Sequence, residues 1–253
     1  MNITHVRNAT LIVEYANKKI LIDPMLGEKG SFPPFPDASR DDQNNPLVEL
    51  PMDINDIISN IDIVILTHLH LDHFDEAAQR LLPKDIKIYT QNYEDAEEVR
   101  NVGFLNVEAL EATNHIGNIN IIKTPAQHGR GEILQVAGNV CGLIFQNENE
   151  KTLYIAGDTV WYEEVEKTLE SYQPEIVVVN GGDNQFNMGG SLIMNEVDIH
   201  KVTKTVPDSK IIVVHMEAVN HWNLSRKDLK QFAATNNFDS QIIIPDDGDK
   251  YKF

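Results

Sequence analysis

The order of strand-like and helix-like segments constrains the fold of this chain more than any other feature of its sequence. Three closely spaced β-rich runs come first, and strand–helix units follow them to about residue 103. A second strand-rich block then precedes a second series of strand–helix units. This order predicts two similar halves, each a sheet with helices on one face. Two such mixed sheets, packed together, form a four-layer αββα sandwich with the helices on the outer faces.

The individual elements follow from apolar periodicity and from proline and glycine breaks. The expected strands are 3–6, 11–15, 19–22, 61–66, 86–89, 107–110, 119–123, 138–145, 152–155, 175–179, 210–214 and 241–244, and the expected helices are 53–60, 75–82, 93–102, 162–170, 195–206 and 225–234. Residues 25–51 form a long irregular stretch with Phe32 and Phe35 among prolines, which indicates either a wall of a functional site or a surface excursion. No linker is evident, so we expect residues 1–253 to form one domain.

The sequence THLHLDH at residues 67–73 directly follows the apolar strand at 61–66. Four metal-capable side chains fall within six positions: His68, His70, Asp72 and His73. An extended chain directs residues 68, 70 and 72 to one side, and a turn into the next helix brings His73 to them. Imidazole and carboxylate are the usual nitrogen and oxygen ligands of divalent metals. The motif therefore predicts a metal site at the end of this strand.

Three more polar residues occur just past β-rich runs. His128 follows the strand at 119–123, Asp158 follows the strand at 152–155, and His215 follows the strand at 210–214. Each of them alone reads equally well as a loop residue. Taken with the cluster at 68–73, they complete a set of donors for two metal ions.

HLHLDH at 68–73, then a lone His, then GDT at 157–159 and a His after an apolar strand resemble the metallo-β-lactamase superfamily in order and spacing over essentially the whole chain. The fold of that family is the αββα sandwich. By position, the resemblance implies that His68, His70 and His128 bind a first metal ion. It implies that Asp72, His73 and His215 bind a second ion, and that Asp158 bridges both.

Several details resemble the L-ascorbate-6-phosphate lactonase-like branch of this superfamily. These are Phe74-Asp75 after the motif, Asn180-Gly181-Gly182, Gly189-Gly190 and the early Asp23-Pro24. The resemblance implies a dinuclear hydrolase with Zn or Mn, or else Fe or Ni, in which a hydroxide shared by the two ions attacks a small ester or lactone. The catalytic residues would be Asp158, which relays the proton, and Asp72, which assists through its second oxygen.

The substrate is less clearly encoded than the metal site. A phosphorylated sugar lactone is the first expectation and a phosphodiester the alternative. A non-catalytic metal-binding or sensing protein of the same fold is the rival from another class. Arg130 either binds an anionic group of the substrate or is a solvated loop arginine. His221 either lines the pocket or caps the helix at 225–234, and Asn184 either hydrogen-bonds the substrate or belongs only to its loop.

Two residues are candidates for supporting the ligands from behind. Metal-binding histidines need an outer hydrogen-bond acceptor. Asp23 ends the third early strand, and Thr67 precedes the histidine motif. We expect these two side chains to orient the ligands rather than to bind metal.

The charge and the cysteine content limit the classes of partner and the cellular location that are expected. The 253 residues contain 21 basic and 39 acidic side chains, a net charge of −18. Such a surface repels nucleic acids and anionic membranes, so a small molecule is the expected partner. The sequence shows no membrane-length apolar run and no signal-peptide pattern, and the single cysteine, Cys141, forms no internal disulfide. A cytoplasmic location is expected. A homo-oligomer is an open alternative, in which the apolar residues of Phe32–Phe35 pack on a second copy of the chain.

Overall fold

The computed structural model describes residues 1–253 and contains two seven-stranded sheets. The first sheet has the strand order β14-β1-β2-β3-β4-β5-β6. Its strands are β1 (Asn2–Arg7), β2 (Thr10–Tyr15), β3 (Lys18–Ile22), β4 (Ile63–Leu66), β5 (Lys87–Thr90), β6 (Asn106–Ala109) and β14 (Lys250–Lys252). Neighbours from β14 to β3 pair antiparallel, and neighbours from β3 to β6 pair in parallel. The sheet is therefore mixed, as predicted.

The second sheet repeats this plan with the strand order β13-β12-β11-β10-β9-β8-β7. Its strands are β7 (Thr113–Ile116), β8 (Ile119–Pro125), β9 (Cys141–Asn147), β10 (Glu150–Ile155), β11 (Ile176–Asn180), β12 (Lys210–Val214) and β13 (Ile242–Ile243). Strands β7 to β10 pair antiparallel, and β10 to β13 pair in parallel. The two halves of the chain thus form similar sheets.

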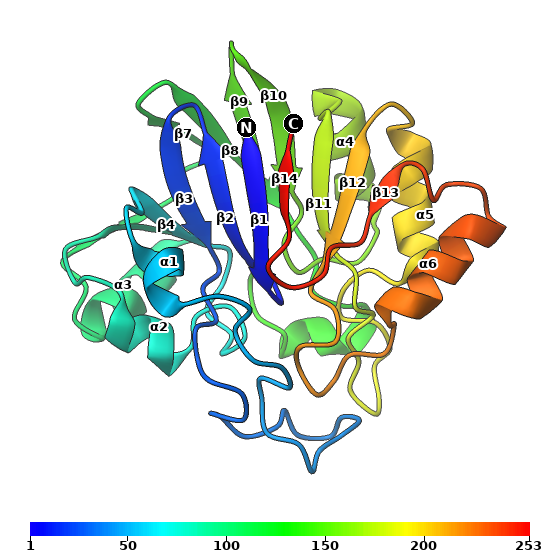
Figure 1. Cartoon of the computed structure of the whole chain (residues 1–253), viewed down its shortest axis with the longest axis horizontal. Helices are drawn as coiled ribbons and strands as arrows, with labels where there is room; N and C mark the ends of the chain where they lie inside the picture. The colour runs from blue at the N-terminus through cyan, green and yellow to red at the C-terminus, as the bar shows by residue number, and fades with distance from the viewer.

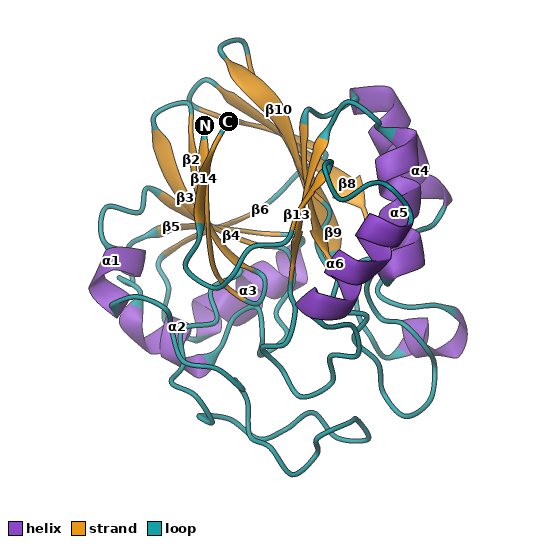
Figure 2. Cartoon of the chain, turned by 45° about the vertical axis from the view of Figure 1, so that its right-hand side comes forward, coloured by secondary structure: helices purple, strands orange, loops and turns teal.

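The helices cover the outer faces of the two sheets (Figure 2). The first sheet carries α1 (Ile54–Ile58), α2 (Glu76–Leu81) and α3 (Tyr93–Asn101), and the second carries α4 (Glu163–Tyr172), α5 (Glu196–Thr205) and α6 (Arg226–Thr235). None of these helices is long and apolar enough to traverse a lipid bilayer. The four-layer αββα sandwich is confirmed.

Side chains from both sheets form the central layer of the core. This layer contains 21 buried residues, among them Ile20 of β3, Phe145 of β9 and Ile155 of β10. The hydroxyl of Tyr15 donates to the carbonyl of Phe145 at 3.2 Å and so ties the first sheet to the second. Cys141 is buried in the same layer.

Side-chain caps set the starts of most helices. Asp75 accepts a hydrogen bond from the amide of Ala78 at the start of α2, and Ser225 accepts one from the amide of Asp228 at the start of α6. Each cap satisfies a backbone N–H that has no partner within the helix. The α2 cap matters for the site because it fixes where the chain leaves the histidine motif.

Several expected elements differ in detail. The strand expected at 107–110 runs parallel to β5 in the first sheet as β6, and does not belong to the second strand block. The strand expected at 138–145 begins only at Cys141, because Gly138 has a φ of 75° and turns the chain. The strands β7 and β14 and the 3-10 helix η1 (Gly131–Gln135) were not expected, because both strands are short and mostly polar and η1 spans only five residues.

The loops that follow β3, β4, β8, β10, β11 and β12 gather at the end of the sandwich opposite the two termini (Figure 1). The stretch 25–51 lies across this end. Asn220 holds it: its side chain accepts from the amide of Phe35 at 2.9 Å and donates to the carbonyls of Phe35 at 3.0 Å and Ser39 at 3.1 Å. The long loop is therefore tied to the chain beyond β12.

Candidate metal centre

The histidine motif leaves β4 as an extended chain and then turns. His68 is 2% exposed, and the amide of His73 donates to the carbonyl of His70 at 2.8 Å, which closes the turn. The turn brings His73 back toward the side on which His68 and Asp72 lie. This is the local geometry that the sequence predicted.

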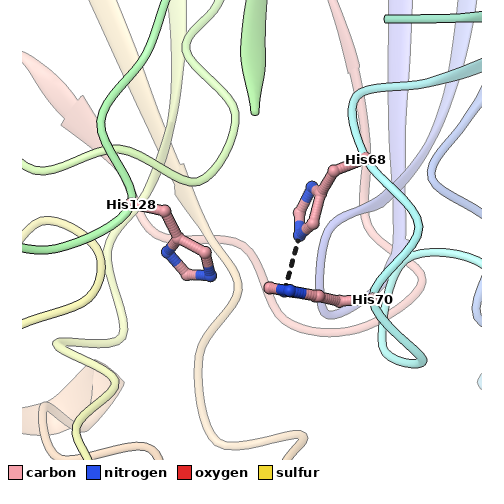
Figure 3. Close-up of side chains that lie close together, drawn as sticks. All are labelled: His68, His70 and His128. Atoms are coloured by element: carbon pink, nitrogen blue, oxygen red, sulfur yellow. Dashed lines mark hydrogen bonds between the residues drawn. The ribbon is translucent and has the colours of Figure 1, made fainter. Parts of the chain in front are cut away.

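Three histidines form the first donor group (Figure 3). His68 Nε2 and His70 Nδ1 lie 3.1 Å apart, and His128 approaches from the loop after β8 on the other sheet. His128 Nδ1 donates to the carbonyl of Leu192 at 3.0 Å, which leaves Nε2 free to bind a metal ion. The two sheets thus contribute to one site.

The second donor group consists of Asp72, His73 and His215. His215 Nε2 lies 3.1 Å from Asp72 Oδ2 and 3.2 Å from His73 Nε2. His215 has a φ of 60°, and its amide donates to the carbonyl of Asn8 at 2.9 Å. This backbone bond joins the end of β12 to the β1–β2 turn and fixes the position of the ring.

Asp158 lies between the two groups. Its Oδ2 is 3.5 Å from His128 Nε2, 3.8 Å from His68 Nε2 and 3.3 Å from His73 Nε2. Its Oδ1 is 3.7 Å from His215 Nε2. One carboxylate therefore reaches donors of both groups.

The spacing of these atoms fits metal coordination. Donors around a tetrahedral zinc ion with bonds of 2.0–2.1 Å lie about 3.4 Å apart. The gaps of 3.1 to 3.8 Å between the site nitrogens and oxygens match that edge length.

Charge gives a second test of the fit. Asp23, Asp72 and Asp158 are each 2–3% exposed, and their ion-pair partners within 4.0 Å are all histidines, with no lysine or arginine. Three buried carboxylates without a fixed cation are costly. Divalent ions between the two groups would supply the missing positive charge.

The pKa values of the donors follow from this crowding. Burial and the neighbouring histidines hold the pKa of His68 well below its ordinary value. Burial lowers the pKa of His73, but Asp158, Asp23 and Asp72 outweigh it and raise that pKa well above the ordinary value. Burial raises the pKa of Asp72 and Asp158, but the charge of His73 prevails and holds both well below the usual range. Both carboxylates are therefore ionised, the form that binds a metal ion.

Asp23 and Thr67 lie behind the donors, where the sequence suggested. Asp23 Oδ1 accepts from the Thr67 amide at 2.8 Å, and Asp23 Oδ2 accepts from the Thr67 hydroxyl at 2.6 Å and from His73 Nδ1 at 2.9 Å. The bond to Nδ1 orients the ring so that His73 Nε2 faces the cluster. Such carboxylate–histidine pairs orient metal ligands.

We expect Asp23→Asn to lower zinc affinity about 10- to 100-fold, the usual effect of removing such a partner. An amide has one oxygen and cannot accept all three of these hydrogen bonds. Competition titration against a zinc-binding dye measures the change. Asp56→Asn, on the exposed face of α1, is the matched control and should leave the affinity unaltered. Equal affinities in the two variants would contradict the role of Asp23.

Two asparagines support the donors and were not predicted from the sequence. Asn180 Nδ2 donates to Asp158 Oδ1 at 2.5 Å, and Asn8 Nδ2 donates to the Asp72 carbonyl at 3.0 Å and to Asp72 Oδ2 at 3.3 Å. Asn180 is the last residue of the apolar strand β11. It therefore carries the same signal, a polar residue at the end of an apolar strand, that identified His128, Asp158 and His215.

The residues predicted to bind substrate lie in three different settings. Arg130 does not reach the donors: it donates to Asp198 Oδ2 at 2.7 Å and to the carbonyl of Trp161 at 3.1 Å. Asn184 is buried behind the site, with its Nδ2 3.4 Å from His215 Nδ1 and 3.1 Å from His221 Nε2. His221 lines the cavity at the donors, and burial lowers its pKa to about 4, so its ring is neutral.

A cavity of about 220 Å³ opens directly onto the donor atoms. Four donors border it, namely His70, Asp72, His128 and Asp158, and the rest of its wall is Phe35, Val136, Ala137, Phe186, Leu192 and His221. No lysine or arginine lines it. A larger hollow of about 660 Å³ beside α2 contains none of the seven donors. The small, mostly apolar cavity is therefore the candidate substrate site, and Phe35 makes part of the 25–51 stretch a wall of that site.

Comparisons with known proteins agree with this geometry. Residues 18–216 match the family model described as Beta-lactamase superfamily domain. The chain is 55% identical to the UPF0173 protein YddR of Bacillus subtilis (strain 168) over 254 residues, with 100% of both chains covered. It is also 26% identical over 210 residues to a UPF0173 metal-dependent hydrolase of Pyrococcus furiosus, covering 82% of this chain and 83% of that relative.

Two solved structures are similar over the full length. The isothiocyanate hydrolase from Delia radicum gut bacteria has a TM-score of 0.96 and 42% identity, with 100% of this chain and 99% of that chain covered. A possible metal-dependent hydrolase from Veillonella parvula has a TM-score of 0.97 and 36% identity, with the same coverage. Yeast PDE1, at 14% identity, shows the fold alone.

The sandwich and the clustered donors define a metal-dependent hydrolase of the metallo-β-lactamase fold. This chain belongs to the β-lactamase superfamily domain family and, within it, groups with the UPF0173 proteins. The superfamily inferred from the sequence is thus confirmed. The lactonase-like branch stays a prediction, since none of these relatives is named a lactonase.

Proposed function

We propose that the protein hydrolyses small uncharged isothiocyanates with the help of two divalent ions held by its seven donors. The observation that carries the proposal is the cavity of about 220 Å³ at the donors, with an apolar wall and no cationic side chain. Its volume is below the usual range for drug-sized ligands, which favours a small substrate. The isothiocyanate hydrolase that shares 42% of this sequence over the whole chain supports the choice.

The cavity is less suited to the substrates expected first from the sequence. A phosphorylated sugar lactone or a phosphodiester brings a negative charge that usually requires arginine or lysine. Arg130 is already paired with Asp198, and acidic residues dominate the chain. An uncharged lactone or ester remains the second candidate, because it fits the same apolar wall.

The seven donors would hold the two ions in the arrangement expected from the sequence. His68, His70 and His128 form one group, Asp72, His73 and His215 form the other, and Asp158 reaches both. Zn or Mn fits these ligands, and Fe or Ni fits them as alternatives. When bound, the ions would lower the pKa of a water and polarise the group under attack.

Two carboxylates of the cavity handle protons in this proposal. Water adds across the C=N bond of R–N=C=S, so that oxygen joins carbon and a proton reaches nitrogen. The thiocarbamic acid then loses COS and leaves the amine R–NH₂. Asp158 relays the proton from a position fixed by Asn180, and Asp72 assists through Oδ1, because only its Oδ2 is held by Asn8.

A substrate comparison tests the proposal. The zinc- or manganese-loaded protein is offered phenethyl isothiocyanate, γ-butyrolactone, a phosphorylated lactone and bis-p-nitrophenyl phosphate. We expect kcat/KM for the isothiocyanate to exceed the others at least 100-fold, with release of amine and complete loss of turnover after chelation. Faster lactone or phosphodiester hydrolysis would overturn the substrate assignment. Two bound ions with no turnover of any class would favour a non-catalytic metal-binding protein.

A further inference from the structure

The mouth of the cavity exposes large apolar side chains. Met188 is 85% exposed, the highest value among the large hydrophobic residues of the chain, and Val136 is 75% exposed. A concentration of exposed apolar side chains next to a cavity is typical of a ligand-binding surface.

These residues border a groove that continues the substrate cavity. The groove has a volume of about 470 Å³ and is lined by Pro36, Asp37, Ile133, Val136, Phe186, Asn187 and Met188. Val136 and Phe186 also line the inner cavity at the donors. The two spaces therefore share a boundary formed by these two side chains.

Three separate segments form the groove, namely residues 36–38, 133–136 and 186–189 with their neighbours. The amide of Asn187 donates to the carbonyl of Asp37 at 2.6 Å, and Ala38 pairs with Phe186 across an isolated β-bridge. On the opposite side, Ile133 packs against the backbone at Gly189, where an added Cβ would lie 3.5 Å from Ile133 Cβ. The same three segments contribute Phe35, Val136 and Phe186 to the inner cavity.

We propose that this outer groove binds the apolar substituent of the substrate while the reactive group lies at the donors. The proposal rests on the proposed function only in placing the reactive end of the substrate at the metal centre. The groove contains one charged side chain, Asp37, and its lining is otherwise aliphatic and aromatic apart from Asn187. The ligand class is therefore an uncharged alkyl or aralkyl chain of several carbons.

Binding of n-alkyl hydroxamates tests the groove without turnover. Hydroxamates bind divalent ions through two oxygens, and their tails then extend from the inner cavity. From acetohydroxamate to octanohydroxamate, we expect the Kd of the zinc-loaded protein to fall up to about fourfold for each methylene that the groove buries. Isothermal titration calorimetry measures the series.

The decisive variants are Met188→Glu and Ile133→Glu, at two residues that line the groove but not the inner cavity. We expect either substitution to remove most of the gain in affinity per methylene. The Kd of acetohydroxamate should stay within about twofold of the wild-type value. Leu105→Glu is the matched control, because Leu105 is 79% exposed and lies before β6, outside the groove. It should retain the full gain. Octanohydroxamate binding no tighter than acetohydroxamate, or an unaltered series in both groove variants, would overturn the proposal.

Turnover separates this proposal from the proposed function. If the chain-length series holds but isothiocyanates are not hydrolysed, the groove is correct and the reactive group has been misassigned. If methyl and hexyl isothiocyanate are hydrolysed with equal kcat/KM and the hydroxamate series is flat, the function is correct and the groove does not bind substrate.

Discussion

Asp158→Asn is expected to lower kcat/KM more than about 100-fold and to reduce the metal content of the protein. Removing a residue that only orients a metal ligand lowers metal affinity or activity about 10- to 100-fold. Asp158 lies directly among the donors of both groups, so a larger loss is expected. The amide loses the negative charge that faces His73, His128 and His68. Steady-state kinetics and elemental analysis of the same preparation measure both effects.

Asp95→Asn is a suitable control for this substitution. Asp95 in α3 is a half-buried carboxylate that accepts a hydrogen bond from Gln91 and contacts none of the seven donors. The control should keep its turnover and its metal. Turnover in Asp158→Asn equal to that of the control would refute the assignment of Asp158.

Arg7→Met is expected to lower the free energy of unfolding by about 3–5 kcal/mol, since each buried carbonyl left without a partner costs about 1–3 kcal/mol. The Arg7 side chain is fully buried and donates to the carbonyls of Met25, Gly27 and Val48, each at 2.9 Å. These bonds hold both ends of the 25–51 stretch, which carries Phe35 to the cavity.

Urea unfolding at pH 7 measures this loss. Arg80→Met on α2 is the matched control, because Arg80 is exposed and its replacement should alter stability by less than about 0.5 kcal/mol. A similar small change for Arg7→Met would mean that the 25–51 stretch does not depend on this guanidinium.

The sequence predicted which side chains form the cluster of candidate metal ligands because their signal is local. His68, His70, Asp72 and His73 lie in one short segment after an apolar strand. His128, Asp158 and His215 each follow such a strand, and adjacent strand ends meet at one edge of a sheet. Asn180 also lies at the end of an apolar strand, but nothing else in the sequence indicated that it supports Asp158.

Other features depend on contacts between distant residues, which the sequence does not show. Arg130 lies two positions from His128, but Gly129 has a φ of 103° and the arginine pairs with Asp198, 68 residues away. In the sequence, Arg7 is simply a polar residue at the end of a predicted strand. In the structure the 25–51 stretch covers it, and its buried guanidinium donates to carbonyls of that stretch. The polar strand β14 exists because β1 offers it a free edge, a pairing across almost the entire chain.

The stoichiometry of bound metal tests the central claim most directly. The protein is purified without chelator, and its metal content is measured by inductively coupled plasma mass spectrometry alongside His70→Ala and His215→Ala. The two donor groups predict about two divalent ions per chain in the wild type and about one in each variant. A wild-type protein that binds one ion or none after incubation with Zn or Mn would contradict the dinuclear centre.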